Sequence, residues 1–206
     1  MSSEKVEGSA RERLLAAANE LFYQEGIHTV GIDRVIERAG VAKASLYSAF
    51  GSKDELVREY LRGRAAIRQQ RISERIARAA EPRQRILAVF DLLGELATEP
   101  TFRGCAFVNA RAEGPREATK VSRVCDDMRA WLRRLFTGLA RDAGAAEPER
   151  LGGELVLLYD GATVGASMDH DPGRARVARA IASRLLDAAV SGDGRRRRVP
   201  ARTGGS

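Results

Sequence analysis

The chain has 206 residues with a formal net charge of +7; 44% are hydrophobic, only 5% are aromatic, and alanine and leucine dominate the apolar set. This composition favours helices over sheets, because alanine and leucine are strong helix formers whereas strands prefer β-branched and aromatic residues. No apolar run approaches the roughly 18 residues of a membrane-spanning helix, and the first residues lack the apolar core of a signal peptide. The two cysteines, Cys105 and Cys125, are too few for a disulfide framework. We therefore expect an all-α protein of the cytoplasm, without a membrane partner.

The positive charge is concentrated in two short segments. Residues 1–63 carry nine basic and ten acidic side chains, a net −1, and residues 81–191 carry sixteen of each. Residues 64–80 carry five arginines and one glutamate, and residues 192–206 carry five arginines and one aspartate, so each segment has a net charge of +4. A basic protein is compatible with a polyanionic partner such as nucleic acid. The pI of about 10.0 does not by itself indicate one, because it arises outside the main body of the chain.

Apolar side chains recur at helical spacing along most of the chain, and glycine and proline mark the breaks. A capping box, serine followed three residues later by glutamate, starts the first helix at Ser9 and Glu12 and the fourth at Ser52 and Glu55. The pattern predicts about nine helices, over residues 10–26, 32–39, 41–50, 53–80, 82–98, 105–113, 116–143, 149–167 and 173–191. The first three form a compact N-terminal unit, and the others form a larger helical body. The periodicity then stops, which predicts a disordered basic tail over residues 192–206.

The two short helices over residues 31–50 form a helix-turn-helix pattern, with Gly40 in the turn between them. The second helix of such a motif brings its first residues to the base edges of the major groove, so small side chains are needed there. Hydroxyl groups one turn later can reach phosphate oxygens, and a lysine at the start of the next helix adds charge. The candidate DNA-binding residues are therefore Lys43, Ala44, Ser45, Tyr47, Ser48 and Lys53. Helical hairpins with a glycine turn are common, so the pattern alone is a weak signal.

The stretch VGIDRVIERAGVAKASLYSAFGSKDELV, residues 30–57, resembles the N-terminal domain of the TetR family of one-component transcriptional regulators. The resemblance rests on the Ala-Gly pair of the turn, on the Lys-Ala-Ser-Leu-Tyr run, and on the Phe and Ser-Lys-Asp-Glu-Leu that follow. It spans residues 10 to about 60. There are three departures: Gly31 and Ala42 stand where the family often has a hydroxyl residue that caps a helix, and Ile36 replaces the usual alanine. These departures affect the expected phosphate contacts.

The resemblance implies a homodimer that binds double-stranded operator DNA of palindromic sequence, usually to repress transcription. A small molecule in the C-terminal body would change the spacing of the two DNA-binding heads and release the DNA. In this interpretation residues 9–53 are the DNA-binding domain, residues 54–191 are the ligand-binding and dimerisation domain, and the helix over 53–80 is the lever between them. No nucleophile–base constellation, metal spacing or phosphate loop indicates an enzyme, and no cofactor is expected.

The last two helices are expected to form a four-helix bundle with those of a second copy, because their many small residues allow close approach. The expected interface residues are Leu155, Leu158, Ala162, Gly165, Val177, Ile181 and Leu185. The expected ligand-binding residues are large side chains of the body with one polar group: Phe90, Phe107, Asn109, Met128, Trp131 and Tyr159. For both sets the alternative is ordinary packing within one chain, since aromatic residues at helical spacing are usually core residues.

Three alternatives stay open at the level of the sequence. Cys105 and Cys125 could make a redox-responsive regulator, or they could be inert buried thiols. The Asp-His-Asp run at 169–171 could suggest a metal ligand set, but it lies in a loop before a proline and the chain has only two histidines, so no metal site is predicted. The arginines of the tail could bind nucleic acid without sequence preference by releasing counterions, or they could be a solvated end without function.

Overall fold

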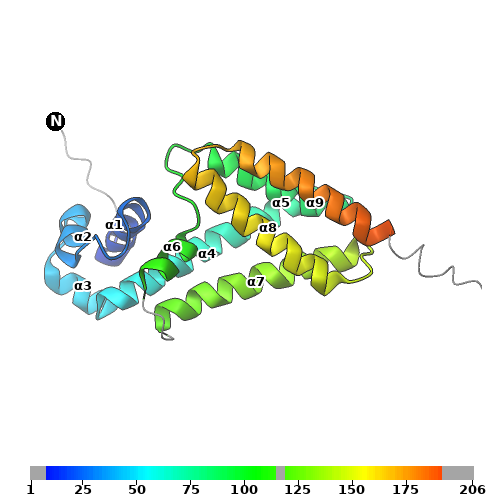
Figure 1. The fold of residues 1–206 in the computed structure, drawn as a ribbon. Helices are drawn as coiled ribbons and strands as arrows, with labels where there is room; N and C mark the ends of the chain where they lie inside the picture. The colour runs from blue at the N-terminus through cyan, green and yellow to red at the C-terminus, as the bar shows by residue number, and fades with distance from the viewer. Residues whose placement is uncertain (1–7, 115–118, 192–206) are drawn as a thin grey trace, which may run out of the picture. The chain divides into compact units, whose positions relative to one another are not determined.

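The computed structural model describes residues 8–114 and 119–191. Within these ranges the chain forms nine α-helices and no strand (Figure 1), which confirms the all-α fold. The helices are α1 (Ala10–Glu25), α2 (Ile32–Ala39), α3 (Lys43–Phe50), α4 (Lys53–Ala77), α5 (Pro82–Ala97), α6 (Ala106–Glu113), α7 (Lys120–Asp142), α8 (Pro148–Met168) and α9 (Gly173–Ser191). None of them is both long enough and apolar enough to span a bilayer. The expected tail at 192–206 lies outside the described residues.

The helices form two compact units. The first unit comprises Met1–Gln70 and Arg103–Ala130, and the second comprises Arg71–Phe102 and Trp131–Ser206. The long helices α4 and α7 each contribute their first turns to the first unit and their last turns to the second. The expected division after residue 53 does not coincide with these units, because α6 and the start of α7 belong to the same unit as the N-terminal helices. As a division of function it stays a prediction.

In the first unit, α1 packs against both α2 and α3. Their shared core contains Leu14, Val35 and Leu46, each fully buried, and burial of such a side chain contributes about 2 kcal/mol. The expected capping box starts α1: the Glu12 amide donates to Ser9 Oγ at 3.2 Å, and the Ser9 amide donates to Glu12 Oε2 at 2.8 Å. The hydrogen bond from the Ser9 amide lowers the pKa of Glu12.

The turn between α2 and α3 depends on Gly40, whose backbone is left-handed with φ of +61°. Glycine adopts this conformation without the steric cost that other residues meet. The Gly40 amide donates to the carbonyl of Glu37 at 3.1 Å, and the next amide donates to the carbonyl of Ile36 at 3.3 Å. Neither Gly31 nor Ala42, which precede α2 and α3, makes a side-chain cap, as the departures from the family pattern predict.

In the second unit, α9 packs against α5 and α8, and these three helices lie side by side in Figure 1. The core includes the fully buried side chains of Phe136, Leu155 and Leu186. Helix α8 approaches α7 closely at Gly152, where an added Cβ atom would lie 2.9 Å from the Thr137 Cα and backbone nitrogen. Some of the small residues of α8 therefore serve packing within one chain.

Candidate DNA-reading surface

One exposed side of α3 carries four neighbouring side chains, which we call the reading surface: Lys43, Ala44, Tyr47 and Ser48. They share this side because residues three and four apart are neighbours on a helix surface. On the opposite side Leu46 is fully buried and Phe50 is 9% exposed, so the core determines which side of α3 faces solvent. All four belong to the expected DNA-binding set. The small side chains of Ala44 and Ser48 leave the helix backbone open to close approach.

The cation of the reading surface is held by α2. The Nζ atom of Lys43 donates to Oδ1 of Asp33 at 2.8 Å, and both side chains are mainly exposed. The hydrogen bond and the negative charge of Asp33 raise the pKa of Lys43. The arginines of α2 are turned toward α1 instead, where Arg34 pairs with Glu25 and Arg38 pairs with Glu20. Of these three cationic side chains, Lys43 is therefore the one that lies at the start of α3.

The two remaining members of the expected set, Ser45 and Lys53, are half-buried. Lys53 donates from Nζ to the carbonyl oxygen of Ile27 at 2.6 Å, and its ammonium lies 5.9 Å from the centre of the Phe22 ring. These contacts fasten the start of α4 to the end of α1. One of the three N–H groups of Lys53 is thus used within the protein, and a phosphate contact through the others stays a prediction.

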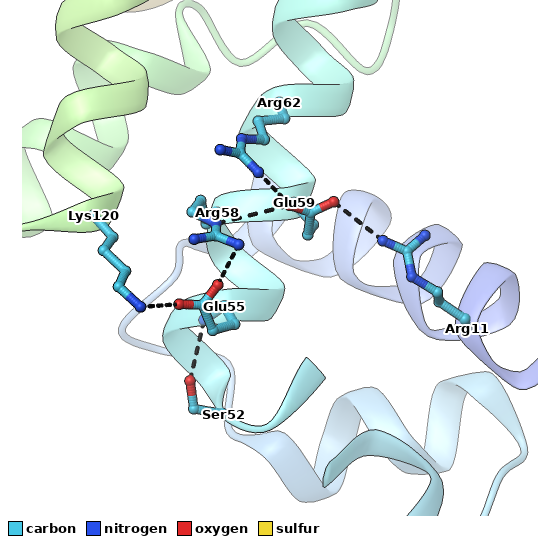
Figure 2. Close-up of polar contacts among 7 residues, drawn as sticks. All are labelled: Arg11, Ser52, Glu55, Arg58, Glu59, Arg62 and Lys120. Atoms are coloured by element: carbon cyan, nitrogen blue, oxygen red, sulfur yellow. Dashed lines mark hydrogen bonds and ion pairs between the residues drawn. The ribbon is translucent and has the colours of Figure 1, made fainter. Parts of the chain in front are cut away.

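The first turns of α4 carry a network of ion pairs (Figure 2). Ser52 Oγ accepts from the Glu55 amide at 3.2 Å, which is half of the expected capping box. The Glu55 carboxylate does not complete the box but pairs with Arg58 at 2.6 Å and with Lys120 of α7 at 2.7 Å. The hydrogen bond from Lys120 is the main cause that lowers the pKa of Glu55, and the nearby positive charges lower it further. The next acidic residue, Glu59, binds Arg11 of α1 and Arg62.

The end of α1 is also fastened to the segment before α6. The Tyr23 hydroxyl donates to the carbonyl of Gly104 at 3.0 Å and accepts from the Arg103 amide at 3.0 Å. The guanidinium of Arg64 lies 3.7 Å from the centre of the Tyr23 ring. Further along α4, Arg71 pairs with Glu99 at 3.2 Å, and Arg75 pairs with Glu95. Three of the five arginines of residues 64–80 therefore contact other side chains of the same chain.

The expected ligand-binding residues fall into different units. Phe90 and Tyr159 belong to the second unit, where their ring centres lie 6.1 Å apart in a buried cluster with Phe136. The half-buried Trp131 packs on the same core. Phe107, Asn109 and Met128 belong to the first unit, and the Asn109 side-chain amide donates to the Arg103 carbonyl at 3.1 Å. The six residues stay a prediction.

A cavity in the second unit reaches one of these residues. It has a volume of about 460 Å³ and is lined by Arg75, Phe90, Asp91, Gly94, Glu95, Thr98, Pro172, Ala175 and Arg176. The cavity thus brings the buried ring of Phe90 together with charged side chains. The sequence did not indicate the charged members, because their convergence depends on how α4, α5 and α9 pack.

An apolar groove runs between α8 and α9 and contains most of the expected interface residues. It has a volume of about 590 Å³ and is lined by Glu154, Leu157, Leu158, Gly161, Ala162, Arg174, Val177, Ala178, Ile181 and Leu185. Gly165 lies against the side chain of Arg174. Leu155 is a correction to the expected set: it is fully buried in the core, so its side chain has no surface for a second copy. Leu157, which is not in the expected set, also lines the groove and is 71% exposed.

The two cysteines lie in the first unit, and their environments differ. Cys105 is half-buried, whereas Cys125 is buried, and burial raises the pKa of Cys125 to about 11. A thiol with a raised pKa is mostly protonated near neutral pH and is a poor nucleophile. Across residues 8–114 and 119–191, no three side chains of His, Cys, Asp or Glu are grouped so that they could hold a metal ion.

Comparison with known proteins relates the site to a family. The family model described as "Bacterial regulatory proteins, tetR family" matches residues 14–60, which contain α2 and α3, most of α1 and the first turns of α4. A solved TetR-family transcriptional regulator from Streptomyces coelicolor is 33% identical, with a TM-score of 0.84 over 88% of this chain and 96% of that chain.

Two curated proteins are similar over a shorter region. The transcriptional activator FasR of Mycolicibacterium smegmatis is 29% identical over 139 residues, which are 65% of this chain and 60% of FasR. The transcriptional repressor NemR of Escherichia coli is 32% identical over 110 residues, which are 52% of this chain and 55% of NemR. The chain therefore spans less than two thirds of the length of these curated relatives.

Proposed function

Because the chain belongs to the TetR family of bacterial regulatory proteins, we propose that it is a sequence-specific DNA-binding regulator of transcription, a repressor that a small-molecule effector releases from its operator. The observation that carries this proposal is the reading surface of α3, where Lys43 and Tyr47 lie beside small side chains. The buried side chain of Leu46 fixes the opposite side of the helix in the core. Such a helix can enter the major groove with its first residues at the base edges. The protein would act in the cytoplasm, without an enzymatic step.

A homodimer is the second part of the proposal. The groove between α8 and α9 exposes Leu157 and Val177, which are 71% and 55% exposed, and a second copy of the chain could cover these apolar side chains. A two-fold symmetric dimer carries two reading surfaces, so its operator should consist of two inverted half-sites.

The effector is the third part. A ligand can release DNA only if it binds more tightly to the conformation that fits the operator poorly. The cavity beside Phe90 in the second unit is our candidate site. The other five expected ligand-binding residues do not line it and stay a separate prediction. Helix α4 carries both Lys53, next to the reading surface, and Arg75, at this cavity, so it is the expected link.

A footprint on the DNA upstream of the coding region tests the proposal. The full chain should protect a discrete palindrome, and a chain that ends at residue 191 should protect the same one. Uniform coverage that disappears when residues 192–206 are removed would instead indicate non-specific, arginine-driven binding. The direction of regulation follows from a reporter placed behind the protected sequence, since the relatives include both an activator and a repressor.

A further inference from the structure

An acidic side chain lies beside the reading surface, where a DNA-binding protein must meet phosphates. Asp33 is in the first turn of α2, its side chain is 82% exposed, and its Oδ1 atom lies 2.8 Å from Nζ of Lys43. An exposed ion pair adds little to folding stability. The packing of α2 and α3 rests instead on buried side chains such as Val35 and Leu46. The packing of α2 and α3 therefore does not depend on this pair, and both of its charged groups remain accessible to DNA.

We propose that Asp33 determines DNA specificity together with Lys43, and that the pair recognises a C·G base pair in each half-site. This inference rests on the proposed function. In the major groove, cytosine presents its N4 amino donor and the paired guanine presents its O6 and N7 acceptors. The carboxylate of Asp33 can accept from cytosine N4, and the ammonium of Lys43 can donate to guanine O6.

The spacing of the two groups supports this match. Cytosine N4 and guanine O6 are hydrogen-bonded to each other, so they lie about 2.9 Å apart. Nζ of Lys43 and Oδ1 of Asp33 lie at nearly the same separation, 2.8 Å, with donor and acceptor in the opposite order. The protein pair therefore offers a complementary partner to each atom of the base pair without first separating its own charges.

Asp33 also explains how a flexible lysine could discriminate between DNA sequences. The ammonium of lysine is a point charge on a long stem, so a free Lys43 would bind any phosphate within reach. Asp33 restrains that ammonium, and its carboxylate repels phosphates that approach the same place. Binding to DNA of the wrong sequence then meets an unfavourable charge, which is specificity by exclusion of competitors. An A·T pair also presents an amino donor, adenine N6, beside a carbonyl acceptor, thymine O4. The adenine N7 acceptor would face the carboxylate and the thymine methyl would face the ammonium, whereas guanine N7 gives Lys43 a second acceptor, so the C·G pair is the better match.

Selection of bound duplexes from a random library tests the inference, with the full chain, D33N, K43Q and E37Q. The E37Q control removes the same charge from an exposed position of the same helix. Wild type and E37Q should select one palindrome with a fixed C·G pair in each half-site. D33N and K43Q should select the same palindrome with that position relaxed. The ratio of operator to random-duplex affinity should fall about tenfold or more in D33N, because a good base contact discriminates by roughly that factor.

The outcomes separate the inference from the proposed function. If wild type selects no motif, the proposed function fails. If wild type selects a motif and D33N keeps the same base preferences and the same affinity ratio, only the present inference is overturned. It is likewise overturned if D33N loses affinity equally at all positions together with thermal stability, because Asp33 would then act only on the start of α2.

Discussion

Lys120, in the first turn of α7, donates a hydrogen bond of 2.7 Å to a carboxylate oxygen of Glu55, in the first turn of α4. The two residues are 65 positions apart in the chain. The bond places the ammonium of Lys120 beside the first turn of α4, the helix that follows the helix-turn-helix in the chain, as Figure 2 shows. Glu55 therefore connects the cap residue Ser52 with a helix that continues into the second unit.

The contact between Glu55 and Lys120 predicts that the free energy of unfolding depends on pH. The pKa of Glu55 is lowered from its ordinary value of 4.5, so the folded state favours the charged carboxylate. The stabilisation is then fully present above the ordinary pKa, and it is lost as the pH falls through the lower, folded-state pKa. We expect E55Q to unfold at lower urea concentration than wild type at pH 7, and we expect this difference to shrink at about pH 3.

D54N is the matched control for this measurement. It removes a negative charge from the same first turn of α4, where the described part of the chain shows no ion pair for Asp54. Its effect on the urea midpoint should be smaller than that of E55Q. An equal shift for the two variants, or a shift for E55Q that persists unchanged in acid, would show that the bond to Lys120 contributes nothing.

Tyr47 should contribute to DNA binding without contributing to the fold. Its side chain is 48% exposed on the reading surface, so Y47A should melt like wild type. Loss of a hydrogen bond to a charged phosphate costs roughly 1.5–3 kcal/mol, so its Kd for the protected duplex should rise about tenfold or more. Fluorescence anisotropy measures this change. Y47F separates the hydroxyl from the ring, and wild-type affinity in Y47A would mean that α3 is not the reading helix.

The groove between α8 and α9 predicts the effect of a charge at Val177. Because an unpaired charge in an apolar interface is costly to desolvate, V177R should weaken self-association at least tenfold. Light scattering at micromolar concentration should give two chains for wild type and one for the variant. I67R is the control, since Ile67 is a similarly exposed apolar residue on α4. A wild-type mass of one chain would remove the dimer from the proposal.

Local signals sufficed to predict the helices of the first unit, because a cap such as Ser9 with Glu12 involves residues three apart. At Ser52 and Glu55 the same pattern predicts two hydrogen bonds, of which the one from the Glu55 amide to Ser52 forms. There the glutamate finds Lys120, whose approach depends on tertiary packing that no local pattern contains. Lys53 is a similar case, since its bond to the Ile27 carbonyl follows from how α4 begins against the end of α1.

The small residues of α8 are a second case in which the sequence pattern does not predict which residues are buried. Gly152 is buried against Thr137, whereas an added Cβ atom at Gly161 would meet nothing within 4 Å, and Gly161 lines the exposed groove. Their spacing along the helix is visible in the sequence. Which side of α8 faces α7 is decided by the packing of the whole unit, so the sequence could not divide these glycines between core and surface.

Gly152 and its neighbour Gly153 give a test of that division within one turn of α8. In G152A the new Cβ atom would lie 2.9 Å from backbone atoms of Thr137, and such overpacking costs about 1–3 kcal/mol. In G153A the Cβ atom meets nothing within 4 Å, so the higher helix propensity of alanine should stabilise the protein by up to about 1 kcal/mol. Thermal unfolding should therefore show a melting temperature several degrees lower for G152A and unchanged or higher for G153A. The reverse order would mean that α8 is rotated about its axis so that Gly153, and not Gly152, faces α7, and the assignment of the groove residues to the surface would then be wrong.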